Sequence, residues 1–347
     1  MTTSAEPSPA AGPLSAVRLG STGPLVGAQG LGCMGMSEFY GSSDPTAARQ
    51  TLERGLELGV TMFDTADMYG RGENERFLAP FVAAHRDDVV IATKFANVRG
   101  PDGTETVRND PAYVRQAVDA SLSRLGVERI DLYYMHRRDS AVPLAESVGA
   151  MGELVAAGKV ASLGLSEVTA DELREAHAVH PIAAVQSEYS VFSRKVERSL
   201  VPAAADLGVG LVAYSPLGRG MLTGALPDAA QLDPGDVRAL LPRFSGANAA
   251  HNAALVATVI EVAHKRGATP AQVALAWLHA RSHVHGVTVV PIPGTRRAER
   301  LEENLGALAV QMTDEESARL DELAEQVAGD RYPDMRATSE HREAQLR

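Results

Sequence analysis

Four polar residues of the chain have the types and spacing of an acid–base site. Asp64 and Tyr69 follow the apolar residues TMF, where a short buried strand gives way to a loop. A carboxylate and a phenol held near each other could form an acid–base site if a cation lies nearby. Lys94, which ends the stretch VVIATK, would be that cation, and His136, which ends IDLYYMH, could hold a substrate oxygen.

These side chains converge only if the strands before them are parallel neighbours. Candidate strands alternate with helices, which predicts a parallel sheet, and eight such units predict a closed (β/α)8 TIM barrel. In a barrel the carboxyl ends of all strands share one mouth, so residues after the second, third and fourth strands would meet there. The strands are expected at 28–32, 61–64, 89–93, 130–135, 160–165, 184–187, 209–214 and 287–292. A lone lysine or histidine at a strand end is more often a solvated or rim residue. The joint occurrence of all four polar residues at the ends of three successive strands favours an active site.

Local signals place helices between these strands. A capping residue followed by proline, at Asp44–Pro45 and again at Asp110–Pro111, is typical of a helix start. Capping boxes predict three more helix starts. They are formed by Thr169 with Glu172, Thr269 with Gln272, and Thr313 with Glu316. The last of these follows the eighth unit and predicts an extra C-terminal helix.

An open doubly wound sheet is the competing arrangement. Gly30, Gly32 and Gly35 spell the dinucleotide fingerprint G-x-G-x-x-G after the first strand. In that fingerprint a helix begins at the third glycine, whereas in this chain the first helix-start signal comes later, at Asp44. The barrel is therefore favoured. Its longest connection, residues 215–286, is expected to hold helices near 252–265 and 270–281 and to serve the site.

The two ends of the chain are assigned separately from the barrel. Residues 1–15 are rich in Pro, Ala and Ser and are expected to form a disordered tail. Glycine and proline between short apolar pieces predict a β-hairpin over residues 17–27. The barrel is assigned to residues 16–325, and residues 326–347 are assigned to a C-terminal tail without periodicity.

Composition favours a globular enzyme of the cytoplasm. The net charge of −11 argues against non-specific nucleic-acid binding, and no apolar run is long enough to span a membrane. The N-terminus lacks the order of a signal peptide, and the single cysteine, Cys33, allows no intrachain disulfide. These features fit a reducing compartment.

Two histidine pairs have the spacing of metal ligands. They are His177 with His180, and His279 with His283. Neither pair lies within a motif such as H-E-x-x-H, so we expect helix-surface residues and predict no metal site.

Several ordered motifs resemble the aldo-keto reductase superfamily over residues 16–325. They are FDTADMYG, ATKF, DLYYMH, GLSE, VQSEYS, AYSPLGRGMLTG and PIPGTRRAERLEENL, and the opening GLGCMGMSEFYG is similar to a microbial and plant branch. The resemblance implies an NADPH-dependent reductase of aldehydes or ketones. It also implies a catalytic tetrad of Asp64, Tyr69, Lys94 and His136, with Tyr69 as the proton donor.

The resemblance assigns one group of residues to the nicotinamide half of the cofactor. Ser166 and Gln186 should hold the carboxamide, and Tyr214 should stack on the ring. Small residues and backbone donors should line the pyrophosphate, where they permit close approach. These are Ser215, Leu217, Gly218 and Gly220.

A second group is assigned to the adenosine half. Thr295 and Arg300 match positions at the 2′-phosphate, and Arg296 adds positive charge. A helix beginning at Thr295 would itself favour an anion. Glu303 and Asn304 match positions near the adenine. The resemblance therefore favours NADPH/NADP+ over NADH.

One position departs from the superfamily pattern. Asparagine often follows the serine of GLS, whereas this chain has Glu167. A carboxylate can accept a hydrogen bond from the carboxamide nitrogen but cannot donate one to its oxygen.

Two other functions stay open on the sequence. Potassium-channel β subunits resemble the same superfamily and act mainly by binding a partner, so a regulatory nucleotide-binding module is one alternative. A lyase that uses Lys94 to form a Schiff base is the other, because a lysine at a barrel strand end can attack a carbonyl.

The substrate is expected to be a small carbonyl compound, but the sequence does not name it. An apolar wall in the first loop could be formed by Met34, Met36, Phe39 and Tyr40. The oligomeric state is also left open.

Overall fold

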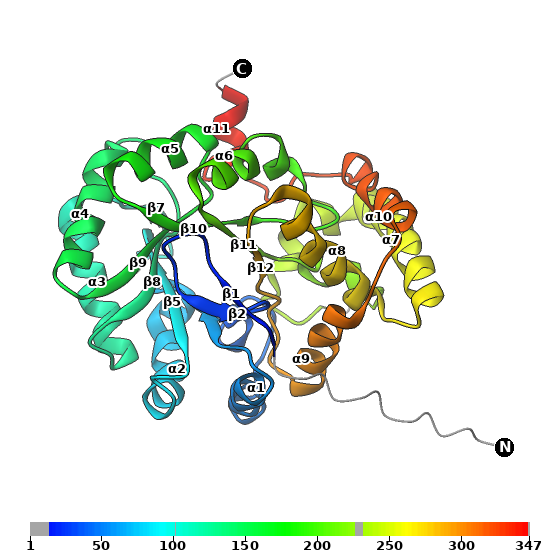
Figure 1. The fold of residues 1–347 in the computed structure, drawn as a ribbon, viewed down its shortest axis with the longest axis horizontal. Helices are drawn as coiled ribbons and strands as arrows, with labels where there is room; N and C mark the ends of the chain where they lie inside the picture. The colour runs from blue at the N-terminus through cyan, green and yellow to red at the C-terminus, as the bar shows by residue number, and fades with distance from the viewer. Residues whose placement is uncertain (1–13, 101, 226–231, 346–347) are drawn as a thin grey trace.

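One parallel sheet of eight strands forms the centre of the molecule (Figure 1). The computed structural model describes residues 14–100, 102–225 and 232–345. Each strand pairs with the next along the chain, from β3 to β12. The strands are β3 (Leu31–Gly32), β4 (Met62–Asp64), β5 (Val90–Phe95), β8 (Ile130–Met135), β9 (Val160–Ser166), β10 (Ile182–Glu188), β11 (Gly210–Tyr214) and β12 (Val289–Pro291). The eight predicted strands are confirmed, with ends shifted by a few residues.

The first and last strands meet and close the sheet. Gly32 forms a parallel bridge with Gly294, and the Gly30 amide donates to the Pro291 carbonyl at 2.9 Å. A Cβ atom on Gly32 would lie 2.9 Å from the backbone oxygen of Ile292, closer than side chains tolerate. Glycine is therefore required at this seam. The closed barrel is confirmed, and the open sheet is excluded.

Helices surround the barrel (Figure 1). The described helices are α1 (Pro45–Glu57), α2 (Glu73–Ala84), α3 (Pro111–Leu125), α4 (Leu144–Ala156), α5 (Ala170–Val179), α6 (Leu200–Leu207), α7 (Gly246–Arg266), α8 (Pro270–His285), α9 (Ala298–Leu305), α10 (Asp314–Asp321) and α11 (Ser339–Gln345). Asp44 caps α1 by accepting from the Thr46 amide at 2.8 Å, and all three predicted capping boxes are formed. No helix in the described part of the chain is long and apolar enough to cross a membrane.

A β-hairpin fills the amino-terminal end of the barrel. Its strands, β1 (Ala16–Arg18) and β2 (Leu25–Gly27), pair antiparallel as predicted. Leu19 and Val26 are buried in one cluster with Met62 and other residues of the barrel interior. Complete burial of a leucine contributes about 1.5–3 kcal/mol, so the hairpin stabilises the closed barrel. The N-terminal tail that the sequence predicts lies, except for residues 14 and 15, outside the described residues.

Two features lie where the sequence predicted no regular structure. A short hairpin of β6 (Asn97–Arg99) and β7 (Glu105–Val107) follows β5. The C-terminal segment, residues 327–345, returns across the barrel and ends in α11, which lies beside α5 and α6 (Figure 1). Both features contribute to the mouth of the barrel.

Candidate active site

A cleft of about 1020 Å³ opens at the carboxyl ends of the strands. It is lined by loops that follow several strands, and it collects nearly all the residues that the sequence singled out. These are Asp64, Tyr69, His136, Ser166, Gln186, Tyr214, Ser215, Leu217, Gly220, Thr295, Arg296, Arg300, Glu303 and Asn304. Lys94 is fully buried below this surface, and Gly218 belongs to the same loop as Leu217.

Lys94 and Asp64 form a buried ion pair below the cleft. The Lys94 Nζ donates to Asp64 Oδ1 at 2.5 Å and to the Thr65 carbonyl at 2.8 Å. Burial opposes the charge on Lys94, but Asp64 and Tyr69 together raise the pKa of this ammonium above its usual value. Gln186 Nε2 donates to the other oxygen of Asp64 at 2.8 Å. Lys94 is therefore a fixed cation.

Tyr69 lies next to this cation. The Lys94 Nζ is 5.2 Å from the centre of the Tyr69 ring. Burial raises the pKa of Tyr69, and the charge of Lys94 offsets this only in part, so the pKa stays above its usual value. The lysine thus acts in the expected direction but does not outweigh burial. The phenol is neutral at physiological pH, which is the form that can donate a proton.

His136 completes the group of four. Its ring centre is 5.9 Å from that of Tyr69, and the two rings are nearly perpendicular. Burial, with the charges of Arg137 and Lys94, lowers the pKa of His136 well below its usual value. A neutral imidazole has one N–H donor, and Nδ1 is buried without a partner among the described residues. The structure therefore brings together all four residues that the sequence predicted.

The residues assigned to the nicotinamide lie on neighbouring strand ends. The Ser166 hydroxyl, from β9, is buried and has no partner within the described chain. A buried hydroxyl without a partner costs about 1–3 kcal/mol, and an amide group in the cleft would relieve that cost. The site therefore fits a nicotinamide carboxamide at this position.

The loop after β11 bends sharply beside the cleft. Ser215, Gly218, Arg219 and Gly220 all have φ between 50° and 96°, in the left-handed region. Two of these residues are not glycine, and such strain persists where the surroundings impose it. This bend directs the loop along the cleft, and the backbone of the loop fits against a pyrophosphate there.

The adenosine end of the cleft has a cluster of arginines. Burial and the neighbouring charge of Arg297 lower the pKa of Arg300, and Arg300 has no carboxylate within 4.0 Å in the described part of the chain. Arg296 donates to the carbonyls of Gly35 at 3.2 Å and Tyr40 at 3.0 Å, so it ties the first loop to this end.

The helix at this end begins later than the sequence predicted. Helix α9 starts at Ala298, with Arg297 as its first flanking residue, and not at Thr295. The Thr295 hydroxyl instead accepts from the Arg297 amide at 3.2 Å and so forms a local turn. The prediction of a helix N-terminus at Thr295 was wrong because this turn holds the chain outside the helix.

The cleft is basic although the whole chain is acidic. Seven arginines line it against four carboxylates, while the chain has a net charge of −11. Such a cleft concentrates anionic ligands. The arginines are Arg99, Arg137, Arg219, Arg238, Arg296, Arg297 and Arg300, and the carboxylates are Asp64, Glu105, Glu303 and Asp334.

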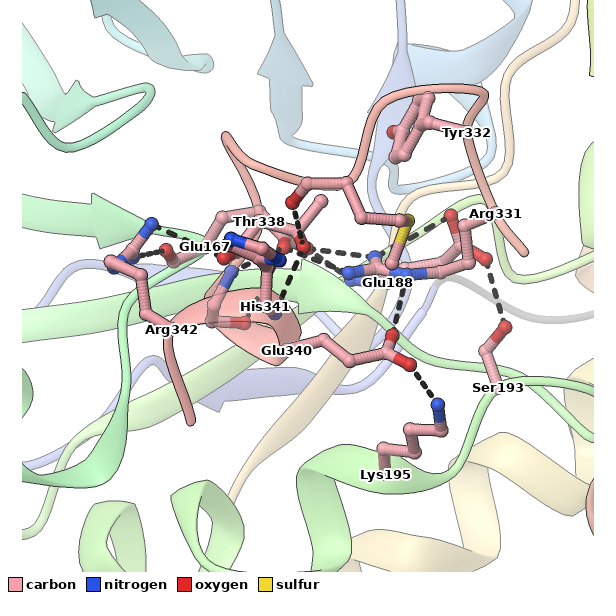
Figure 2. Close-up of polar contacts among 12 residues, drawn as sticks. Glu167, Glu188, Ser193, Lys195, Arg331, Tyr332, Thr338, Glu340, His341 and Arg342 are labelled. Atoms are coloured by element: carbon pink, nitrogen blue, oxygen red, sulfur yellow. Dashed lines mark hydrogen bonds and ion pairs between the residues drawn. The ribbon is translucent and has the colours of Figure 1, made fainter. Parts of the chain in front are cut away.

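Glu167, the position that departs from the superfamily pattern, is held by a residue that the sequence did not identify. Arg331 donates to both carboxylate oxygens of Glu167 at 3.0 Å (Figure 2). The Tyr214 hydroxyl donates to one of these oxygens at 2.7 Å. Burial opposes the charge on Glu167, yet Arg331 holds the pKa of this carboxyl well below its usual range. The carboxylate is thus fully occupied by protein donors.

The rest of the C-terminal segment is fixed in the same region (Figure 2). The Ser339 amide donates to Glu167 at 3.2 Å, and Arg342 donates to Glu172 at 2.9 Å. The hydroxyl of Tyr332, which lines the cleft, accepts from Arg219 at 2.7 Å. The C-terminal segment therefore forms one wall of the cleft. It has no periodic pattern by which the sequence could have revealed this role.

Three histidines of the two pairs, His177, His180 and His279, hydrogen-bond other residues of the chain. No three His, Cys, Asp or Glu side chains within the described ranges could hold one metal ion together. His279 instead hydrogen-bonds Gln29 across 3.1 Å, at the opposite end of the barrel from the cleft.

The fold agrees with the comparisons to known proteins. The model of the aldo/keto reductase family matches residues 29–325, and the chain belongs to this family. Membership implies an oxidoreductase that uses a nicotinamide cofactor on small carbonyl compounds.

Three solved structures are similar over nearly the whole chain. The glycerol dehydrogenase AKR11B4 from Gluconobacter oxydans is 25% identical with a TM-score of 0.80, covering 92% of this chain and 98% of that one. The thermostable aldo-keto reductase Tm1743, solved with the inhibitor epalrestat, is 29% identical with a TM-score of 0.70, covering 89% and 100%. The aldo-keto reductase AKR11C1 from Bacillus halodurans, in its holo form, is 26% identical with a TM-score of 0.72, covering 93% and 99%.

Proposed function

We propose that this protein is an NADPH-dependent carbonyl reductase with Tyr69 as its proton donor. The observation that carries the proposal is the position of Lys94, which contacts Asp64 at 2.5 Å and lies 5.2 Å from the Tyr69 ring. A fixed ammonium beside a neutral phenol stabilises the phenolate that is left when the phenol gives up its proton.

Each of the four residues has one task in this reaction. A reduced nicotinamide, when bound, supplies a hydride to the carbonyl carbon. The His136 N–H donates to the carbonyl oxygen and holds it near Tyr69. Tyr69 gives its hydroxyl proton to that oxygen, so an alcohol and a phenolate result. Asp64 keeps Lys94 charged and in place beside the phenolate.

The cofactor contacts follow the two groups of residues described above. Ser166 and Gln186 would hold the carboxamide, Tyr214 would stack on the ring, and Ser215, Leu217, Gly218 and Gly220 would follow the pyrophosphate. Because Glu167 is bound by Arg331, it is not free to serve the carboxamide, and Ser166 has the unpartnered hydroxyl. Thr295, Arg296 and Arg300 would read the 2′-phosphate, and Glu303 with Asn304 would lie near the adenine.

Lys94 is poorly suited to the alternative role of a Schiff-base nucleophile. Such a lysine must present a neutral amine to the substrate. The side chain of Lys94 is fully buried, and Asp64 favours its charged form. We also propose a reducing compartment such as the cytoplasm, because a single cysteine allows no intrachain disulfide.

A panel of aldehydes and ketones with NADPH tests the proposal. We expect turnover that consumes NADPH in proportion to the alcohol formed, measured by nicotinamide absorbance and by product analysis. The same panel with NADH should give a much lower kcat/KM. A chain that binds NADPH but reduces no member of a broad panel would support a binding module instead.

A further inference from the structure

One arginine at the catalytic end of the cleft has no carboxylate partner. Arg137 follows His136 directly, and its side chain lines the cleft. The structure gives its guanidinium one hydrogen bond within the described residues, to the His136 carbonyl at 2.8 Å. No Asp or Glu of the described chain lies within 4.0 Å of it. Since a guanidinium has five N–H donors, most of its capacity is unused.

The next residue shows what a structural arginine looks like in the same loop. Arg138 contacts Glu172 at 3.2 Å and donates to the carbonyls of Asp139 and Val142, both at 2.9 Å. Arg219, on another wall of the cleft, contacts Glu188 at 3.5 Å and Tyr332 at 2.7 Å. Arg137 therefore differs from Arg138 and Arg219 in having no ion pair within 4.0 Å among the described residues.

The backbone of Arg137 is held firmly in place. Buried Asn109 donates to the Arg137 carbonyl at 3.0 Å and accepts from the Asp139 amide. Ser147 donates to the Asn109 carbonyl at 2.8 Å. These contacts fix the backbone of the loop after β8, and the bond to the His136 carbonyl restricts the guanidinium itself. A preorganised donor binds a ligand more tightly than a mobile one.

Arg137 lies at the catalytic end of the cleft. It follows His136 in the chain and lines the same cleft as Tyr69 and His136. Three other arginines that line the cleft, Arg296, Arg297 and Arg300, also have no ion pair within 4.0 Å among the described residues, and they lie at the adenosine end. Arg137 is the one such arginine of the described lining at the catalytic end.

We propose that Arg137 is a specificity-determining residue that binds an oxyanion group, a carboxylate or a phosphate, on the carbonyl substrate. This inference rests on the proposed reductase function and names a substrate class for it. Planar arginine matches both anions with paired, charge-assisted hydrogen bonds. Because Arg137 adjoins His136, the anion should lie a short distance from the reacting carbonyl.

Matched pairs of substrates test the proposal. Succinic semialdehyde is compared with its methyl ester, and glyceraldehyde 3-phosphate with glyceraldehyde, each with saturating NADPH. We expect wild-type kcat/KM to be roughly 10- to 100-fold higher for the anionic member of at least one pair, the range for hydrogen bonds to a charged group. The pair that shows the preference distinguishes a carboxylate site from a phosphate site.

The Arg137→Met variant should abolish this preference while leaving kcat/KM for the neutral members within about threefold, well below the effect of a lost charged hydrogen bond. Arg137→Lys should retain part of it, because lysine keeps the charge but not the paired donors. Arg319→Met on α10, where the arginine pairs with Glu261 on the surface, controls for net charge. A merely structural role for Arg137 would lower both members of a pair equally and would overturn the proposal.

A binding measurement keeps the test independent of turnover. Calorimetric titration of succinate and of inorganic phosphate into the NADP+-loaded protein should show binding of one anion that Arg137→Met weakens at least tenfold. If Arg137→Met loses this anion binding but the wild-type protein reduces no aldehyde, the anion site is supported and the reductase function is contradicted. Equal kcat/KM within both pairs, and anion binding unchanged by Arg137→Met, would overturn the anion site and leave the reductase function intact.

Discussion

Arg331 donates a hydrogen bond to each carboxylate oxygen of Glu167, both at 3.0 Å, across 164 residues of sequence. Glu167 follows a barrel strand, whereas Arg331 belongs to the C-terminal segment. The Tyr214 hydroxyl donates to the same carboxylate at 2.7 Å. The pair therefore joins the C-terminal segment to the residue expected to stack on the nicotinamide.

Arg331→Met should destabilise the protein strongly. The side chains of both partners are almost completely buried, and removing one leaves an unpaired charge in the interior. Breaking a buried pair in this way costs about 3–5 kcal/mol. The loss would be measured as a lower urea midpoint.

Two further variants separate the contribution of the buried Glu167–Arg331 pair from that of an ordinary surface pair. Arg336→Met breaks an ion pair with Asp334 that is largely exposed, and it should cost less than about 1 kcal/mol. Glu167→Gln combined with Arg331→Met should recover part of the stability, because the buried charge is gone. Equal losses for Arg331→Met and Arg336→Met would show that the buried pair has no special role.

The carboxyl group of Asp67 should make stability depend on pH. Burial, with the charge of Glu75, raises the pKa of Asp67 from 3.8 to about 8, and Arg124 opposes this. The folded protein then keeps a proton that the unfolded chain releases. The resulting stability is present below about pH 4 and is lost as the pH rises toward 8, by up to about 1.4 kcal/mol per pH unit.

Asp67→Asn removes the titration while keeping the shape of the side chain. Urea midpoints between pH 4 and 8 should fall less steeply with pH in this variant than in the wild type. Asp119→Asn, in an exposed ion pair with Lys159, is the matched control. Parallel pH profiles for Asp67→Asn and the wild type would rule out a protonated Asp67.

Much of the fold could be predicted because its signals are local. Asp44 and Thr169 cap helices through contacts within three residues, which the sequence displays directly. The group of four also follows from local signals, since Lys94 and His136 each end an apolar strand. Once the barrel is inferred, its geometry brings these strand ends together.

The features that the sequence missed depend on contacts between distant segments or on weaker signals. The hairpin of β6 and β7 flanks the residues PDG, a turn signal that could have revealed it. The C-terminal segment has neither periodicity nor a turn motif. Its position is set by Arg331 and Arg342, whose partners lie 164 and 170 residues earlier.

Arg300→Ala should change cofactor preference. Arg300 has no carboxylate partner in the described chain and lies where the 2′-phosphate is expected. Its removal should weaken NADPH binding by roughly 1.5–3 kcal/mol and leave NADH nearly unaffected. Fluorescence titration with both cofactors measures this. Equal weakening of the two would exclude Arg300 from reading the phosphate.

Lys94→Met separates the reductase from the lyase. Without the ammonium the pKa of Tyr69 should rise further, so the pH profile for alcohol oxidation should move upward, because oxidation uses the phenolate as base. Borohydride added with a carbonyl substrate should leave no adduct on the wild-type chain, as measured by intact mass. An adduct on Lys94, with turnover independent of NADPH, would establish Schiff-base chemistry instead.

Tyr133→Phe is the matched control for Tyr69→Phe, the variant that tests the proton donor. Tyr133 is a buried tyrosine of β8 that does not line the cleft, and its hydroxyl has no partner among the described residues. Removing that hydroxyl should change neither NADPH binding nor turnover. Tyr133→Phe therefore reports any general effect of replacing a buried tyrosine.

The most direct test of the account is the kcat of Tyr69→Phe with NADPH and the best aldehyde of the panel. This change removes the transferable proton and keeps the ring. We predict that kcat falls by roughly 10²-fold or more, the usual contribution of a general acid, while the Kd for NADPH stays near the wild-type value. A kcat within a few-fold of that of Tyr133→Phe would contradict the assignment of Tyr69 as proton donor.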